Sequence, residues 1–272
     1  MSLHEKNERL GEILREMDRI LLAFSGGVDS TFLLARAYEE IGDNVLAVIA
    51  ASETFPTREF NEAVALAKEI GAPHFTTEVK EFENEKFVAN NPDRCYHCRD
   101  GLHTHLTALA REKGYAYVVD GTNASDMGDY RPGMKALREK GIRSPLLEAK
   151  LTKDDIRQLS KEMGLRTWNK PSFACLSSRI PYGTRITKSA IDRLDLAEDY
   201  MFKLGFYQVR VRDHDKMARI EVMPNEFEKV LAHHEEIHAA FIKFGFQYVT
   251  LDLQGYRTGS MNEVLEKAGL EQ

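Results

Sequence analysis

The sequence predicts an α/β fold with a doubly wound parallel sheet, followed by a smaller α+β domain. Two observations predict it. Short apolar runs alternate with segments of helical periodicity along residues 1–182, which is typical of parallel β-α units. This order changes after the segment RIPYGTRIT, where alternating runs pair as a hairpin. We therefore expect two domains, at 1–182 and 183–272.

Each element follows from the spacing of its apolar residues. Apolar runs indicate strands at 19–24, 44–52, 74–79 and 115–121, and helical spacing indicates helices at 31–41, 59–71, 102–113 and 151–164. Thr152 can cap the last of these helices, with Asp155 at the capping-box position. In the second domain we expect a helix at 188–204, a hairpin of 207–214 with 217–223, a helix at 225–244 and a strand at 248–253.

Composition restricts the class of protein. The chain has 37 Lys and Arg against 43 Asp and Glu, a net charge of −6, which argues against a large nucleic-acid surface. The N-terminus is polar, which excludes a signal peptide, and no apolar run approaches the roughly 20 residues of a membrane span. Three cysteines make a poor disulfide framework, so we expect a cytoplasmic protein in which close thiols serve metal binding or catalysis.

The segment SGGVDS lies between the first expected strand and the first expected helix. Ser25, Gly26, Gly27 and Ser30 can direct backbone and hydroxyl donors toward an anion, and the helix start adds the positive end of its dipole. The segment matches neither the G-x-x-x-x-G-K-[ST] loop nor G-x-G-x-x-G. It therefore predicts a phosphate site unlike those of kinases and dinucleotide-binding domains.

This segment resembles the pyrophosphate loop of the ATP pyrophosphatases, which cleave ATP between the α- and β-phosphates and adenylate an oxygen of the substrate. The resemblance implies ATP and Mg²⁺ as cofactors, and a catalytic role for Asp29 in holding Mg²⁺ on pyrophosphate. It also implies that Gly121, Asp129 and Arg131 line the ATP site, although Pro132 and Gly133 would equally form a plain turn there.

Longer segments narrow the resemblance. They are GTNASDMGDYRPG, WNKPSFACLSSRIPYGTRIT, VRVRDH, ARIE and YVTLDLQGYRTGSMN, and together they resemble the LarE family. These ATP-dependent sulfur transferases of nickel-pincer nucleotide synthesis convert the carboxylates of pyridinium-3,5-biscarboxylic acid mononucleotide into thiocarboxylates. The resemblance implies a small nucleotide substrate, AMP and pyrophosphate as products, and a homo-oligomer, by analogy a hexamer. We expect no membrane partner and no nucleic acid.

Two arginines suggest where that nucleotide binds. Arg210 and Arg212 alternate on one strand and so face the same side, where two guanidiniums repel unless an anion lies between them. The strand pattern alone equally fits an ordinary edge strand with solvated arginines. By resemblance, Ser178, Arg179, Arg210 and Arg212 bind the substrate phosphate, and Glu198 coordinates a divalent cation nearby.

The three cysteines, Cys95, Cys98 and Cys175, are expected to act together. Three thiolates can hold a [4Fe–4S] cluster with one iron open, as in one branch of the family, and that iron can receive sulfide or sulfur from a persulfide donor. Alternatively, Cys175 attacks the acyl-adenylate and gives up its own sulfur, as in the branch without Cys-x-x-Cys. A redox pair, a catalytic disulfide with Cys175, and a zinc site completed by His97 or His103 remain as further alternatives.

Three other functions compete with sulfur transfer to a mononucleotide. A tRNA thiolase shares the ATP chemistry, but it needs an RNA-binding surface that the net charge of −6 disfavours. A nucleotide-binding regulator would leave the arginines and cysteines without a role. An amidating synthetase needs an ammonia source, and no domain for one is expected here.

Overall fold

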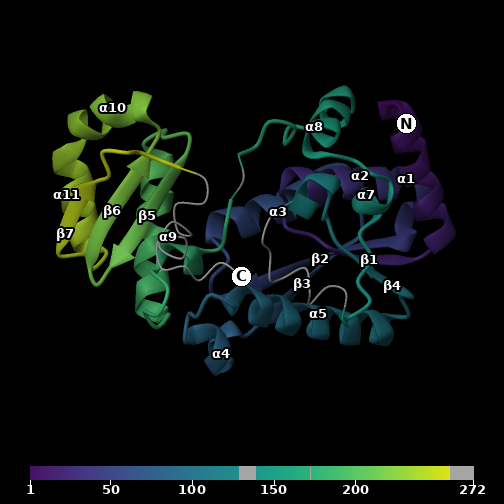
Figure 1. The fold of residues 1–272 in the computed structure, drawn as a ribbon, viewed down its shortest axis with the longest axis horizontal. Helices are drawn as coiled ribbons and strands as arrows, with labels where there is room; N and C mark the ends of the chain where they lie inside the picture. Colours follow the sequence, from purple (N-terminus) through teal and green to yellow (C-terminus); the bar gives the residue numbers. More distant parts are fainter. Residues whose placement is uncertain (129–138, 172, 258–272) are drawn as a thin grey trace. The chain divides into compact units, whose positions relative to one another are not determined.

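The chain forms two compact units in the computed structural model, which describes residues 1–128, 139–171 and 173–257. The first unit contains Met1–Phe87 and Asp93–Phe173; the second contains Val88–Pro92 and the chain from Ala174 onward (Figure 1). The domain boundary expected after residue 182 stays a prediction. No helix in the described ranges is long and apolar enough to cross a membrane.

The first unit is built on a four-stranded parallel sheet, as predicted. Its strands are β1 (Ile20–Ala23), β2 (Val45–Ser52), β3 (His74–Val79) and β4 (Tyr117–Val119). The order β3-β2-β1-β4 places β1 in the interior, with Ile20 paired to Val45 on one side and to Tyr117 on the other. Chain segments that follow β1 and β4 therefore emerge at neighbouring points of one sheet edge.

Helices cover both faces of this sheet, which explains why β1, β2 and β4 are continuous apolar runs. Ile20 and Leu22 of β1 face a large core, whereas Leu21 faces a smaller one. The helices on the large core are α1 (Leu3–Met17), α2 (Val28–Ile41), α3 (Thr57–Ile70), α7 (Pro145–Glu148) and α8 (Lys153–Glu162). The smaller core packs under α5 (Arg94–Lys113). Figure 1 shows α5 on the opposite side of the sheet from α1 and α2.

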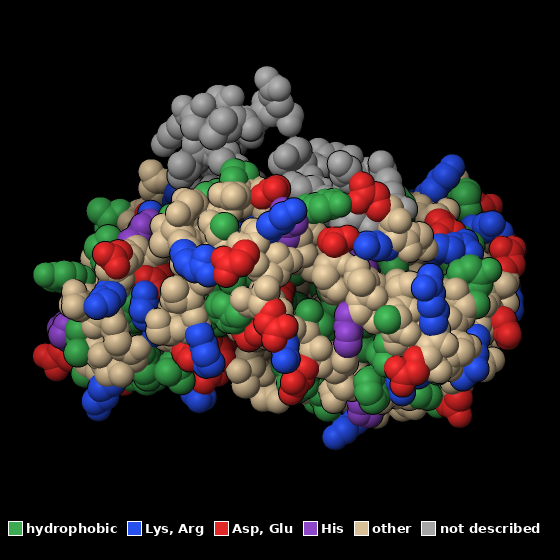
Figure 2. Space-filling view, turned by 90° about the horizontal axis from the view of Figure 1, so that it is seen from below, with side chains coloured by type: hydrophobic (Ala, Val, Ile, Leu, Met, Phe, Trp, Pro, Cys, Tyr) green, Lys and Arg blue, Asp and Glu red, His purple; other side chains and the backbone are tan. Residues whose placement is uncertain are grey.

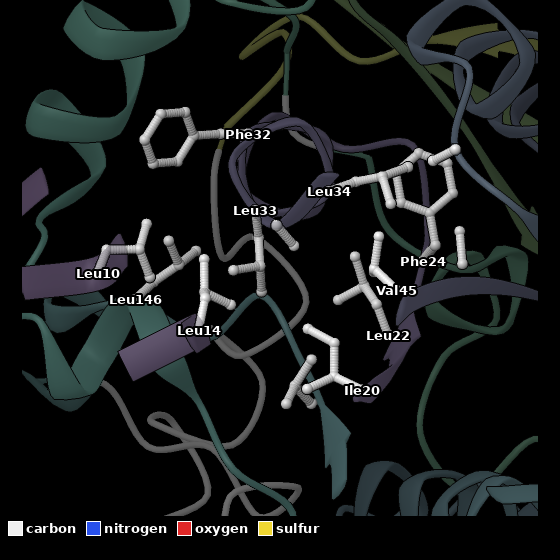
Figure 3. Packing of buried hydrophobic residues seen from close by; sticks show 14 of the residues in the cluster. Leu10, Leu14, Ile20, Leu22, Phe24, Phe32, Leu33, Leu34, Val45 and Leu146 are labelled. Carbon is white, nitrogen blue, oxygen red and sulfur yellow. The ribbon is translucent and has the colours of Figure 1, made fainter. Parts of the chain in front are cut away.

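Side chains from four different elements meet in the large core. Figure 3 shows Leu14 of α1, Leu33 of α2, Ile20 of β1 and Leu146 of α7 gathered there, and each is at most 1% exposed. Burial of this apolar surface fixes α2 against β1. The turn between β1 and α2, which carries SGGVDS, is therefore anchored at both ends.

The helices α1 and α5 differ from the predictions, whereas the start of α8 agrees with them. Helix α1 is absent from the predicted elements, and it begins with a capping box between Ser2 and Glu5. Helix α5 begins at Arg94 instead of residue 102, so the Cys-x-x-Cys pair lies in its first two turns. The capping box predicted for Thr152 and Asp155 at the start of α8 is confirmed.

The second unit contains a three-stranded sheet in the order β5-β6-β7. The predicted hairpin is confirmed as β5 (Val209–His214) and β6 (Met217–Val222), and β7 (Tyr248–Leu251) adds to β6 in parallel. Helix α9 (Lys188–Lys203) contacts β5. A short segment of the first half of the chain, Val88–Pro92, also belongs to this unit.

The single helix predicted at 225–244 is wrong, because two helices occupy this range. They are α10 (Phe227–Ala232) and α11 (His234–Lys243). The backbone of His233 leaves helical values between them (φ −101°, ψ 14°), and the ring of His234 bonds to the carbonyl oxygen of Leu231 at 2.8 Å. Local side-chain bonds of this kind compete with the continuation of a helix.

Candidate functional site

The glycine loop (residues 25–30) connects β1 to α2 through a backbone that only glycine supports. Gly26 has φ +68°, and a Cβ there would lie 2.9 Å from the Cα of Ala63 in α3. Gly27 is the N-cap of α2 and supplies no side-chain bond to the first turn of the helix. The hydroxyls of Ser25 and Ser30 lie 3.1 Å apart across the loop. Backbone donors, two hydroxyls and a helix N-terminus thus converge, an arrangement that suits a phosphate group.

Asp29, the predicted magnesium ligand, lies in the first turn of α2 beside this loop. Its Oδ2 is 2.6 Å from Nζ of Lys153, and its Oδ1 accepts a bond of 3.3 Å from Nδ2 of Asn123. Gly121 lies against the same turn, since a Cβ on it would be 3.1 Å from the backbone nitrogen of Ser30. The structure therefore brings Gly121 and Asp29 together, and their role in binding ATP stays a prediction. Asp129 and Arg131 lie outside the described residues.

Lys170 approaches the glycine loop from a third segment. Its Nζ donates to the carbonyl oxygen of Gly26 at 3.1 Å and lies 2.7 Å from Oε2 of Glu59. Glu59 is a buried residue of α3, so this lysine ties the loop to that helix. Asn123, Lys153 and Lys170 are absent from the predicted site residues. Asn123 and Lys170 lie within segments that resemble the family, whereas Lys153 lies outside all of them.

Cys95 and Cys98 are one turn apart at the start of α5, and both are partly exposed cysteines outside any disulfide bond. The thiol of Cys98 donates to Oε1 of Glu81 at 2.9 Å, and Oε2 of this buried carboxylate accepts a bond from Thr54 at 2.6 Å. His97 between the two cysteines directs its Nε2 to Asp93, 3.1 Å away. Because this ring nitrogen is directed to the N-cap residue of its own helix, the contact does not favour His97 as a zinc ligand.

The described residues contain no cluster of three or more His, Cys, Asp or Glu side chains arranged to hold a metal. Cys95 and Cys98 belong to the first unit and Cys175 to the second. The chemistry of the donors nevertheless suits iron, because thiolates are the ligands of iron–sulfur clusters and none of the three cysteines is in a disulfide bond. Joint ligation by the three cysteines stays a prediction.

In the second unit, four predicted substrate residues lie in one network. Arg179 is 1% exposed and donates through Nε and Nη2 to the two carboxylate oxygens of Glu198, at 2.8 Å each. Its third nitrogen, Nη1, donates to Oγ of Ser178 at 2.7 Å. Glu198 also accepts the backbone N–H of Val211, at 2.9 Å. In this structure Glu198 orders an arginine, and its predicted role as a cation ligand stays a prediction.

The other two arginines lie on β5 beside this pair. Arg212 donates through two nitrogens to the buried carboxylate of Glu221, at 2.9 and 2.8 Å, and through the third to the carbonyl oxygen of Ser178 at 2.8 Å. Arg210 lies over the ring of Tyr256, 5.4 Å from its centre. Burial, reinforced by the positive charge of Arg179, lowers the pKa of Arg210. Binding of the substrate phosphate by these arginines stays a prediction.

Cys175 lies next to this arginine network. Its carbonyl oxygen accepts bonds from Nη1 of Arg179 at 3.0 Å and from Oγ of Ser178 at 2.8 Å. Its sulfur lies 2.8 Å from Oγ of Ser177. The candidate sulfur atom and the candidate phosphate-binding groups therefore share one short segment, which the Arg179 side chain holds in place.

A parallel sheet whose first strand leads through SGGVDS into a helix, with an acidic residue in that helix's first turn, defines a PP-loop protein of the ATP pyrophosphatase class. Comparison with known proteins narrows the class. The chain belongs to the LarE family, because it is 42% identical over 270 residues to the pyridinium-3,5-bisthiocarboxylic acid mononucleotide synthase of Lactiplantibacillus plantarum, covering 99% of this chain and 98% of that enzyme. No family model matches the chain.

Two further relatives are consistent with this placement. An uncharacterized protein of Synechocystis is 44% identical over 267 residues and is matched over its whole length. A tRNA-specific 2-thiouridylase of Desulforamulus reducens is 27% identical over 193 residues, which cover 56% of this chain and 53% of that protein. The match to the 2-thiouridylase supports the PP-loop fold of the first unit.

Proposed function

We propose that the protein is an ATP-dependent sulfur transferase that adenylates the carboxylates of pyridinium-3,5-biscarboxylic acid mononucleotide and converts them to thiocarboxylates, with release of AMP and pyrophosphate. The observation that carries the proposal is the pairing of Cys175 with the arginine network through Arg179. A phosphate bound by these arginines would hold its nucleotide beside a cysteine sulfur. The name of the L. plantarum relative supports this substrate.

The residues of the first unit would supply the activation step. The glycine loop binds the pyrophosphate portion of ATP through its backbone and hydroxyl donors, and Asp29 holds Mg²⁺ on the same phosphates. Mg²⁺ supplies positive charge that stabilises the departing pyrophosphate. The loop itself contains no lysine, which favours cleavage between the α- and β-phosphates over transfer of the terminal phosphate.

For the sulfur, we propose that Cys95, Cys98 and Cys175 would hold a [4Fe–4S] cluster, which would supply an iron site for sulfide delivered as such or released from a persulfide donor by a thiol reductant. The alternative is that Cys175 gives its own sulfur to the same adenylate. Either route uses Cys175. A homo-oligomeric state also stays a prediction.

A tRNA thiolase is the second candidate, supported by the partial match to a 2-thiouridylase. Such an enzyme needs a basic surface for its RNA. On the face drawn in Figure 2, lysine and arginine side chains are interspersed with aspartate and glutamate and form no continuous basic area. Together with the net charge of −6, this favours the mononucleotide substrate.

Chromatography of the products tests the proposal. Incubation with ATP, Mg²⁺ and the dicarboxylate mononucleotide should give AMP and pyrophosphate, and ADP with phosphate would contradict the assignment. Asp29→Asn should abolish adenylation without unfolding the chain, because Asp29 is a partly exposed residue that packs no core.

Two measurements separate the sulfur sources. Iron and sulfide counted per chain after anaerobic reconstitution should fall in each of Cys95→Ala, Cys98→Ala and Cys175→Ala. Mass spectrometry after turnover should show Cys175 intact. Loss of one H₂S at Cys175, with Cys95→Ala and Cys98→Ala retaining full multiple-turnover activity, would instead establish the sacrificial route.

A further inference from the structure

The glycine loop carries one carboxylate and no cation, although it is expected to bind a polyphosphate. Among the described residues, the positively charged group in contact with Asp29 is Lys153, whose Nζ lies 2.6 Å from Oδ2 of Asp29. The two residues are 124 positions apart in the sequence. Lys153 of helix α8 therefore places a positive charge at the loop, whereas kinase-type loops contain a lysine within their own sequence.

The backbone of Lys153 is held by a hydrogen bond, whereas its side chain can rotate. It is the first residue of α8, directly after the capping residue Thr152, and its backbone N–H donates to Oγ of Ser125 at 3.0 Å. Its side chain is 32% exposed. The ammonium group can therefore move by side-chain rotation alone while the Cα stays in place.

Lys170, the second lysine at the loop, has a different partner. Its ammonium is matched by Glu59, a buried carboxylate of α3 that lies outside the loop, and it also bonds to the carbonyl oxygen of Gly26. Neither contact involves Asp29. Lys153, in contrast, is paired with the residue that is expected to receive Mg²⁺.

We propose that Lys153 is the phosphate-binding lysine of this ATP site, acting on the pyrophosphate portion of the nucleotide. The inference rests on the proposed function. When Asp29 turns its carboxylate to Mg²⁺, Lys153 loses its counter-charge beside an anion that carries several negative charges. Its ammonium then donates to a phosphate oxygen next to the loop. In the structure described here it pairs with Asp29, which keeps the acidic residue and the lysine together at the loop.

A structural tie between α2 and α8 is the competing explanation, and the chain offers a matched control for it. Lys6 contacts Asp155 of the same helix α8, also at 2.6 Å, with both side chains about as exposed as those of Lys153 and Asp29 (19% and 21% against 32% and 23%). Lys6→Met removes a lysine–aspartate contact of the same length from α8 without touching the glycine loop.

Calorimetric titration of Lys153→Met and Lys6→Met with magnesium ATP, magnesium pyrophosphate and AMP tests the proposal. Lys153→Met should weaken binding of ATP and pyrophosphate by about ten- to a hundredfold, the loss expected for one charged hydrogen bond, and leave AMP binding unchanged. Lys6→Met should change none of the three affinities. Lys153→Arg, which keeps the charge, should retain most of the ATP affinity.

The possible failures are distinguishable. A wild-type protein that binds neither ATP nor pyrophosphate would overturn both the proposed function and this inference. Tight binding by wild type with unchanged affinities in Lys153→Met, or with equal losses for AMP and ATP, would overturn this inference alone. Lys153→Gln provides a second neutral variant if Lys153→Met does not fold.

Discussion

Glu198 holds the guanidinium of Arg179 through both carboxylate oxygens, and both side chains are buried in the second unit. Burial alone would raise the pKa of Glu198, but the charge and hydrogen bonds of Arg179, together with the charge of Arg210 and the backbone N–H of Val211, hold this pKa below its ordinary value. The remaining nitrogen of Arg179 bonds to the segment that contains Cys175 and Ser178. The pair therefore fixes the position of the candidate sulfur atom from α9.

We expect Glu198→Ala to destabilise the second unit by about 3–5 kcal/mol, because it leaves Arg179 buried without a counter-charge. Denaturant unfolding measures the change. The control is Asp192→Ala, which removes an exposed ion pair with Lys188 from the same helix and should cost less than about 1 kcal/mol. Equal effects of the two substitutions would show that Arg179 finds another partner.

Two adjacent glycines of the loop should respond differently to alanine. Gly26→Ala places a Cβ 2.9 Å from the Cα of Ala63 at φ +68°, so backbone must shift. The left-handed conformation alone costs about 1–2 kcal/mol for a residue other than glycine. Gly27 has an extended backbone (φ −76°, ψ 169°), and its added Cβ would meet nothing closer than 3.5 Å.

We therefore expect Gly26→Ala to abolish ATP binding and lower the melting temperature, and Gly27→Ala to leave the melting temperature nearly unchanged. Thermal unfolding and ATP titration of the two variants provide the measurement. A Gly26→Ala protein that binds ATP as wild type would show that the loop tolerates a displaced backbone.

The parallel sheet and the glycine loop could be predicted because their signals are local. Strands β1, β2 and β4 are continuous apolar runs, and the loop chemistry lies within six consecutive residues. The start of α5 was missed because the segment RCYHCRD has no apolar periodicity, and its burial comes from tertiary contacts. Helix α1 shows the helical spacing in Leu10, Ile13, Leu14 and Met17, so this signal was present in the sequence.

The partners of the loop could not be predicted, because pairing depends on the fold. Lys153 is 124 positions from Asp29, and Lys170 is 144 positions from Gly26. Nothing in the local sequence distinguishes these lysines from solvated ones. The same holds for Asn90, which precedes the Cys-x-x-Cys pair in sequence but belongs to the second unit.

Asn90 connects the segment Val88–Pro92 to the rest of the second unit. It is fully buried, and its Nδ2 lies within hydrogen-bond distance of the carbonyl oxygens of Ile180 (3.3 Å), Pro181 (2.8 Å) and Thr184 (2.8 Å). Its φ is +57°, a conformation that asparagine and glycine accept better than other residues.

Replacement of Asn90 separates these two effects. Asn90→Gly keeps the conformation and loses the side-chain bonds, so it should cost about 1–3 kcal/mol. Asn90→Ala should cost about 1–2 kcal/mol more, because it adds the left-handed strain. Denaturant unfolding of both variants gives the two values, and an alanine variant as stable as the glycine variant would contradict the strain argument.

The last prediction concerns acid stability and His103, a buried residue of α5. Burial lowers its pKa from 6.5 to about 4; Asp120 and Asp100 oppose the shift and Arg99 adds to it. Between these two pKa values the unfolded chain binds a proton that the folded chain does not. The free energy of unfolding should therefore fall as the pH drops through this window, by about 1.4 kcal/mol per unit and about 3 kcal/mol in total.

His103→Gln removes this titrating group. Between about pH 4 and 6.5, the free energy of unfolding of the variant should depend less on pH, with close to one proton fewer taken up on unfolding. This holds even if the variant is less stable than wild type at neutral pH. The pKa of His214 is also lowered by burial, but His214 remains in both proteins, so its contribution cancels in the difference. Denaturant unfolding at several pH values measures both slopes. Parallel curves for wild type and variant would mean that His103 accepts a proton in the folded chain as readily as in the unfolded one.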